Sequence, residues 1–112
     1  MFLYLVSCQQ QTKPLPTYDK YNKDTQLMIN ICNKLSKESD AKTLHKIAVS
    51  TLQARVVSCS DYFGECNQYG KFLSLAAELS KDQILTDLDR QELNNALRDL
   101  ETKVRQGKAR LK

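Results

Sequence analysis

Apolar residues recur with a period of about 3.6 from Asp24 to the end of this chain. Such a period is typical of amphipathic helices that bury one face. The 112 residues include only three glycines and two prolines, which leaves few turn signals for a many-stranded β fold. The sequence therefore predicts an all-α fold, a small bundle of about four helices on an N-terminal flexible tether.

Three apolar stripes predict the first three helices. The first helix is expected over 24–37, with Asp24 as its N-cap and with Leu27, Met28, Ile31, Cys32 and Leu35 on its apolar face. Ser39 or Asp40 is expected to cap the second helix, which carries Leu44, Ile47, Ala48, Thr51, Leu52, Val56 and Cys59. An interruption is expected over 58–70, because Gly64, Asn67 and Gly70 fall there. A shorter third helix then carries Tyr69, Phe72, Leu73, Ala76 and Leu79.

The last helix has the most regular pattern. Thr86 and Asp89 form a capping box in which Asp replaces the usual Glu or Gln. The residues that follow repeat with the spacing of a coiled-coil seam: Leu93, Leu97, Leu100, Val104, Gly107 and Leu111. A glycine inside a helix costs up to about 1 kcal/mol, so Gly107 predicts an end that frays or is held by something outside the domain. We therefore expect the seam to be divided between the core and a protein partner, with Val104 and Leu111 as partner-binding residues.

Tyr62 and Phe63 form an aromatic pair in the expected interruption. Aromatic residues are enriched at the energetic centres of protein interfaces. One interpretation is that this pair is presented to a partner. The alternative is that the two rings close one end of the bundle, and the sequence does not decide between them.

The four cysteines constrain the redox compartment. In an antiparallel pair of the first two helices, Cys59 would lie about 18 Å along the axis from the residues that face Cys32, and a disulfide needs Cα atoms within about 7 Å. Cys59 and Cys66 instead bracket a short loop. We therefore predict a Cys59–Cys66 disulfide with Cys32 as a buried thiol, although a Cys32–Cys66 bond is an open alternative. Such a bond implies an oxidising compartment.

The N-terminus suggests how the chain reaches that compartment. An apolar run leads into Leu5-Val6-Ser7-Cys8 and then into a polar stretch. This tetrapeptide resembles the lipobox of bacterial lipoproteins, and the resemblance implies cleavage before Cys8 and lipidation of its sulfur and new amino group. Gln9 rather than aspartate follows, which in that family implies the outer membrane, facing the periplasm. The expected organisation is then a signal-peptide remnant over 1–7, a lipidated linker over 8–22 and a helical domain over 23–112.

Two alternatives to this organisation stay open. A secretory signal has a basic segment before its apolar one, yet no Lys or Arg precedes Lys13. Translation from a start upstream of Met1 would explain this. The other alternative is an apolar tail that packs on the domain, with an ordinary cysteine at position 8.

A faint likeness to the pilotin lipoproteins of secretion systems lies in Gln26-Leu27, Cys32, Asp40-Ala41, Leu44 and Ile47-Ala48-Val49. It covers about a quarter of the chain, and Cys66 does not fall in the last helix, where those pilotins have their second cysteine. The likeness implies a membrane-anchored accessory that binds a protein partner in the cell envelope. Alternatives are an exclusion or immunity lipoprotein of a plasmid or phage, and a cytosolic helical interaction module with reduced cysteines.

The sequence offers little support for catalysis. The lone histidine, His45, lies between Lys42 and Lys46 and is expected on an exposed helix surface. Asp87 and Asp89 lack the further ligands and the glycine of a calcium loop. No serine stands in a nucleophile-elbow context, and no glycine-rich phosphate loop is present. We therefore expect no enzyme activity, no cofactor or metal, and neither a nucleic acid nor a small-molecule substrate.

The net charge of +4 is uneven only at the C-terminus. The last acidic residue is Glu101, and five cations follow it: Lys103, Arg105, Lys108, Arg110 and Lys112. We expect these side chains to be solvated at the end of a helix, where cations suit the helix dipole. Contact with anionic lipid headgroups or with an acidic partner is the functional alternative.

Overall fold

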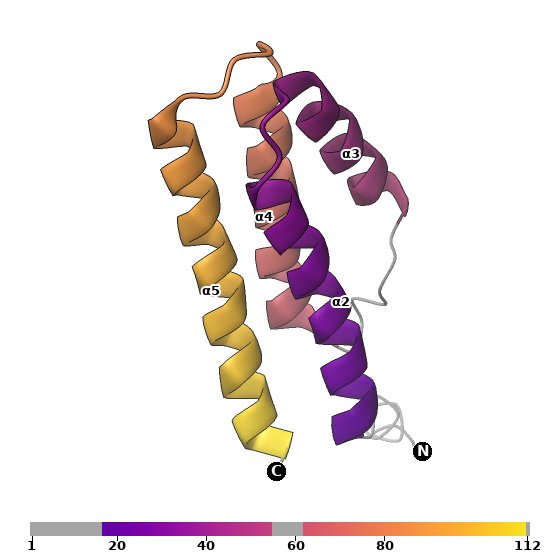
Figure 1. The fold of residues 1–112 in the computed structure, drawn as a ribbon. Coiled ribbons are helices and arrows are strands. Elements are labelled where there is room, and N and C mark those ends of the chain that lie inside the picture. The colour runs from indigo at the N-terminus through magenta and orange to yellow at the C-terminus, as the bar shows by residue number, and fades with distance from the viewer. Residues whose placement is uncertain (1–16, 55–61, 112) are drawn as a thin grey trace, which may run out of the picture.

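The computed structural model describes residues 17–54 and 62–111, and over these ranges the regular structure is entirely helical (Figure 1). The helices are α2 (Tyr18–Ser36), α3 (Ala41–Ala54), α4 (Phe63–Ser80) and α5 (Asp87–Leu111). The predicted all-α bundle is confirmed. None of these helices is both long enough and apolar enough to span a bilayer.

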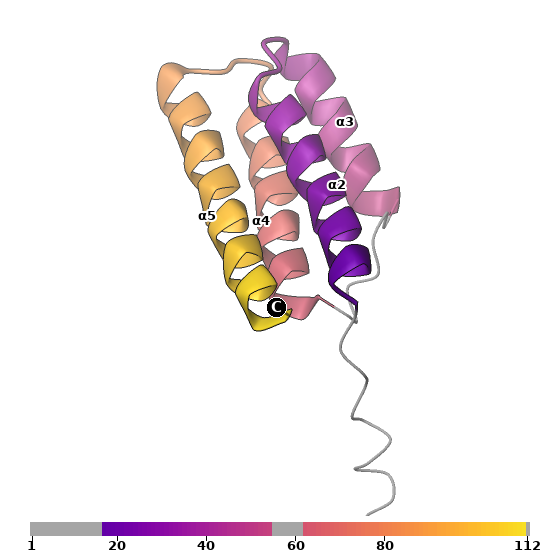
Figure 2. The same cartoon turned by 60° about the horizontal axis from the view of Figure 1, so that its bottom comes forward.

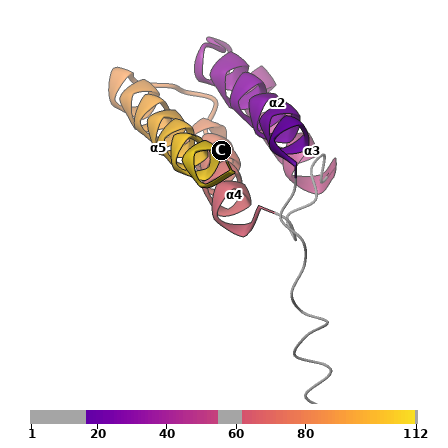
Figure 3. The same cartoon turned by 90° about the horizontal axis from the view of Figure 1, so that it is seen from below.

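Helix α4 lies at the centre of the bundle and contacts each of the other three helices. Helices α2 and α5 pack against each other and against α4, whereas α3 packs mainly on α4 and makes few contacts with α2. α3 is seen outside the other three helices in Figures 1 and 2, and Figure 3 looks along the bundle. α2 and α4 begin at the end of the bundle where α5 finishes. We call residues 18–24, 63–66 and 101–111 the proximal end.

The core is formed by one face of each helix. Most residues of the predicted apolar stripes contribute to it, but the stripes were wrong at Leu27, Ile47 and Leu52, which are 39%, 38% and 37% exposed. Its fully buried side chains include Met28, Cys32, Leu44, Phe72, Leu73, Leu93 and Leu100. The seam of the last helix continues into this core through Leu97, Val104 and Gly107. Most of the stability of these helices comes from the packing of their apolar faces against one another. Intrinsic helix propensity contributes less.

Three of the four helices in the described residues begin at a side-chain cap, and α4 begins after Tyr62 without one. The Thr17 side chain accepts a hydrogen bond from the Lys20 amide, and Asp40, one of the two residues expected to cap the second helix, accepts one from the Thr43 amide at 3.1 Å. In α5 the capping box is reciprocal. The Thr86 amide donates to Asp89 Oδ2 at 3.1 Å, and the Asp89 amide donates to Thr86 Oγ1 at 3.0 Å. The capping box predicted from the sequence is therefore confirmed.

The first helix begins six residues earlier than predicted. Its N-cap is Thr17 rather than Asp24, so part of the expected linker, 18–22, is helical. The reason is that Tyr21 and Thr25 add two buried positions at the start of the stripe. Their exposed fractions are 2% and 0%.

The third helix also begins earlier than predicted. The expected interruption over 58–70 is wrong from Phe63 onward, because α4 includes Gly64, Asn67 and Gly70. Tyr62, Cys66 and Tyr69 are all buried beside these residues. Their packing outweighs the helix penalty of the two glycines, about 1 kcal/mol each.

Gly107 is required by close packing, which corrects our interpretation that it marks a fraying end. A Cβ atom at this position would overlap the Tyr21 hydroxyl and would lie 2.6 Å from Glu65 Oε2. At Gly70, by contrast, a Cβ atom would meet nothing within 4 Å. The two glycines therefore occupy helices for different reasons.

We expect Gly107→Ala to destabilise the protein by about 1–3 kcal/mol, because the added methyl group overpacks the contact with Tyr21. Gly70→Ala is the matched control. It should stabilise the protein by about 0.5–1 kcal/mol, because alanine is the better helix former and finds open space. Urea unfolding followed by circular dichroism measures both. Equal effects of the two substitutions would show that Gly107 has no special packing role.

Candidate functional site

Tyr62 closes the proximal end of the bundle and is only 2% exposed. Its ring meets the Tyr21 ring edge to face, with centroids 5.5 Å apart and an interplanar angle of 81°. Of the two interpretations left open by the sequence, closure of the bundle is therefore correct for Tyr62, and presentation to a partner is not. The Phe63 side chain lies outside the described part of the structure.

A polar network surrounds the Tyr62 hydroxyl. The hydroxyl donates to Asp24 Oδ2 at 2.6 Å and accepts from Lys20 Nζ at 3.0 Å. Lys20 also forms an ion pair with Asp24 at 2.9 Å. The hydrogen bond from Tyr62, followed by that from Lys20, lowers the pKa of Asp24. Burial, followed by the bond to Asp24, raises the pKa of Tyr62. This network joins the start of α2 to the residue that precedes α4.

A second network lies beside it and joins three helices. The Tyr21 hydroxyl on α2 donates to Glu65 Oε2 on α4 at 2.5 Å and lies 3.3 Å from the carbonyl oxygen of Val104 on α5. Glu65 is 4% exposed, and Arg110 lies 3.8 Å from the same carboxylate oxygen. A buried carboxylate needs such partners, because its desolvation is otherwise very unfavourable.

These two networks are missed by a reading of the sequence. Tyr21 and Glu65 are separated by 44 positions, and neither belongs to a recognisable motif. The only signal was that Tyr21 lies four residues before Thr25 and seven before Met28, on the same helix face. Asp24, predicted as a helix cap, instead binds Lys20 and Tyr62.

Cys32 is a free cysteine and is fully buried, as predicted. Burial raises the pKa of its thiol, so it is held in the neutral form. Because Cys32 is free, the alternative Cys32–Cys66 disulfide is wrong. Cys66 lies on α4 with 7% exposure. Cys59 and Cys8 lie outside the described residues, so the Cys59–Cys66 disulfide and the lipidation of Cys8 stay predictions.

His45 connects α3 to α4 and is not the fully exposed residue that we expected. It is half-buried, and its Nδ1 lies 2.9 Å from the carbonyl oxygen of Ala77. This distance fits a hydrogen bond in which the imidazole N–H donates to the carbonyl group. The contact helps to fix α3 on α4, which is a structural role.

The two seam residues proposed to bind a partner lie in different environments. Val104 is 2% exposed and belongs to the core, so it offers no surface to a partner. Leu111 is half-buried and packs against the edge of the core. Tyr62 and Val104 are therefore both unavailable to a protein partner.

An apolar groove of about 220 Å³ lies between α2 and α3, where the two helices have few contacts. It is lined by Ile31, Lys34, Leu35, Glu38, Ile47 and Thr51. Ile47 is 38% exposed. We refer to these six lining residues as the α2–α3 groove.

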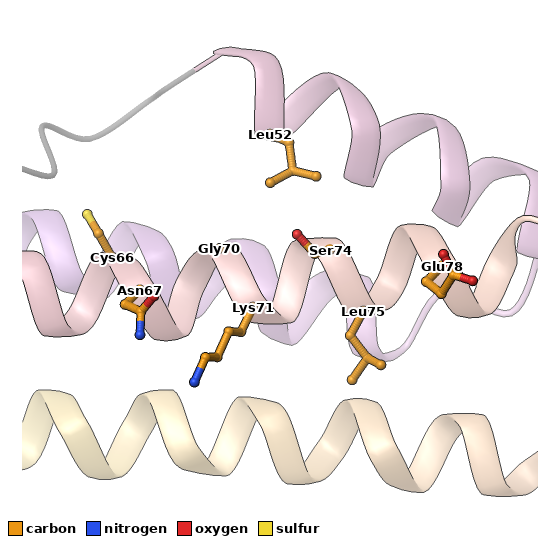
Figure 4. A pocket seen from close by; sticks show the side chains of 8 residues that line it. All are labelled: Leu52, Cys66, Asn67, Gly70, Lys71, Ser74, Leu75 and Glu78. Carbon is orange, nitrogen blue, oxygen red and sulfur yellow. The ribbon is translucent and has the colours of Figure 1, made fainter.

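A second, larger groove of about 640 Å³ runs along α4 and is partly covered by α3 (Figure 4). Leu52 points into it from α3, while Asn67, Lys71, Ser74 and Glu78 bring polar groups from α4. Its lining is more polar than that of the α2–α3 groove.

Within residues 17–54 and 62–111 no group of three or more His, Cys, Asp or Glu side chains could hold a metal ion. No family model, no curated protein and no solved structure matches this chain. The fold and the contacts of the described residues are therefore the basis for assigning a function.

The buried Tyr21 phenol should make the protein sensitive to alkaline pH. Burial, and then the hydrogen bond to Glu65, raises the pKa of Tyr21 above its ordinary value of 10.0. The folded state therefore holds this proton more tightly than the unfolded state does. The resulting stability is fully present below about pH 10 and is lost as the pH rises above it.

We expect the free energy of unfolding to fall above about pH 10, and to fall less steeply in Tyr21→Phe. Tyr18→Phe is the control. Because the Tyr18 side chain is 36% exposed, this substitution should not change the slope. Urea unfolding at a series of pH values measures the slope. An identical slope in the wild type and in Tyr21→Phe would exclude this phenol as the titrating group.

Proposed function

We propose that this chain is an exported lipoprotein, anchored through Cys8 in the outer membrane and facing the periplasm. There it acts as a binding accessory during the assembly of an envelope machine, in the manner of a pilotin and without catalysis. The α2–α3 groove is the observation that carries the binding role, and the lipobox resemblance of Leu5-Val6-Ser7-Cys8 supports the anchor.

The groove has the features that an amphipathic helix or an extended peptide needs for docking. Its walls are apolar on both helices, through Ile31 and Leu35 on α2 and Ile47 on α3. Lys34 and Glu38 lie at its rim and supply both signs of charge. Helix-in-groove recognition uses this combination of an apolar floor with charged edges.

Several residues that carry the pilotin likeness are buried, namely Cys32, Ala41, Leu44 and Ala48, so their likeness concerns packing. Ile47 is instead 38% exposed and lines the α2–α3 groove. The likeness thus includes one surface position at the place where a partner would bind. A Cys59–Cys66 disulfide, if formed, would suit the oxidising periplasm.

The anchor is tested by Cys8→Ser, expressed with the native sequence upstream of Met1. After the membranes are washed at high salt, which releases proteins held by charge alone, we expect the wild type in the membrane fraction and Cys8→Ser in the soluble fraction, because the variant lacks the thiol that carries the lipid. Acyl chains provide durable attachment when there are two or more of them. Ser7→Ala keeps a small residue before the cysteine and should stay with the membrane.

Fractionation followed by mass spectrometry of the N-terminal peptide measures both variants. Recovery of the wild type in the soluble fraction, with an unmodified peptide spanning Met1 to Cys8, would refute the anchor.

The groove is tested by Ile47→Ser. The Ile47 side chain is 38% exposed, so the variant should fold with a nearly unchanged melting temperature. Binding of a partner should weaken by at least tenfold, because each buried aliphatic side chain contributes about 1.5–3 kcal/mol. Leu88→Ser is the matched control, since Leu88 is 65% exposed but lies on α5, outside the groove.

Affinity capture from detergent-solubilised envelopes, followed by mass spectrometry, compares the three proteins. The wild type and Leu88→Ser should retain the same partner, and the groove variant should lose it. Retention of that partner by the groove variant at wild-type levels would place the binding surface elsewhere.

A further inference from the structure

The proximal end of the bundle combines three helix ends and an excess of cations. It carries six cations against four carboxylates in the described residues: Lys20, Lys23, Lys103, Arg105, Lys108 and Arg110 against Asp19, Asp24, Glu65 and Glu101. Residues 34–46 and 78–92, at the opposite end, carry six cations against seven carboxylates. The charge of the domain is therefore polarised along its long axis.

Two carboxylates of the proximal end are buried or hydrogen-bonded. Positive charge therefore predominates on the surface of this end. Glu65 is 4% exposed and accepts the hydrogen bond from Tyr21, and Asp24 is occupied by Tyr62 and Lys20. Four of the six cations are exposed, namely Lys20, Lys23, Arg105 and Arg110, whereas Lys103 and Lys108 are half-buried. The Arg110 side chain is 66% exposed although it lies 3.8 Å from Glu65.

The polypeptide enters the domain at this same end. Thr17 caps α2 there, and Cys8 precedes Thr17 by nine residues. Nine residues span at most about 30 Å even when fully extended, which is shorter than the ~37 Å length of a 25-residue helix such as α5. A chain fixed to a membrane at Cys8 would therefore hold the proximal end close to the lipid surface.

We infer that the proximal end is a docking surface for anionic phospholipid headgroups. Its cations contact the phosphate layer. Tyr18 lies in the first turn of α2 and is 36% exposed. Its side chain would reach the membrane interface, which aromatic side chains favour. The biological setting of this surface rests on the proposed anchor, but its affinity for lipid does not. Docking would fix the domain upright on the membrane rather than leave it free on its tether.

The test uses the full chain with Cys8→Ser, so that no acyl chain contributes. Co-sedimentation is measured with vesicles of phosphatidylcholine alone and of equimolar phosphatidylcholine and phosphatidylglycerol. We expect binding to the anionic vesicles only, and release when the salt concentration is raised, because screening shortens the reach of surface charges. Each cation removed near an anionic membrane should weaken binding by about fivefold.

Two charge-matched variants locate the surface. Lys23→Gln with Arg105→Gln removes two exposed cations from the proximal end, and Lys42→Gln with Lys46→Gln removes two exposed cations from α3 near the opposite end. The first pair should lower binding by about twenty-five-fold and the second should not. Equal binding to both kinds of vesicle, or equal loss in both variants, would overturn the inference. Because Cys8 is replaced throughout, such a result would leave the proposed anchor to be judged by membrane fractionation alone.

Discussion

The hydrogen bond from Tyr21 to Glu65 holds the proximal half of this bundle together. Glu65 is a carboxylate with 4% exposure, and a group of this kind can be buried only where donors reach it. Tyr21 reaches it from α2 at 2.5 Å, and Arg110 approaches from α5. The contact is possible because Gly107 has no side chain where the Tyr21 hydroxyl lies. Three helices thus depend on one phenol and one glycine.

The same arrangement explains why α3 stands apart. α2, α4 and α5 are tied to one another at the proximal end, so α3 is left to pack mainly on α4. His45 binds the Ala77 carbonyl group, and Leu44 and Ala48 are buried at 0% exposure. These contacts fix α3 on its α4 side and leave Ile47 on the opposite side. The α2–α3 groove is therefore a consequence of the packing order and not of a local distortion.

The sequence predicted those parts of the structure that depend on local patterns. Spacing and residue type are enough to predict three features: the stripe from Leu93 to Val104, the reciprocal cap formed by Thr86 and Asp89, and the burial of Cys32. What could not be predicted depends on contacts between distant residues. Tyr21 extends α2 because its ring packs on Tyr62, 41 positions away, and Gly64 stays helical because Tyr62 and Cys66 are buried beside it. Gly107 shows the difference most clearly. The low helix propensity of glycine indicates a weak helix at this position. In the structure, the missing side chain leaves room for the Tyr21 hydroxyl.

The two surfaces proposed to act outside the bundle do not compete for the same residues. The cations of the proximal end lie on α5 and the first turns of α2, whereas the groove is lined by the second half of α2 and the middle of α3. Since α2 and α5 run along the bundle (Figure 2), a domain standing on its proximal end would present the groove on its side, away from the lipid. A protein segment bound there would be held at a fixed height above the membrane. Tethering alone would set only a maximum distance, because a flexible linker leaves orientation free. Docking of the proximal end would supply that orientation, and it would do so through charges that play no part in the groove.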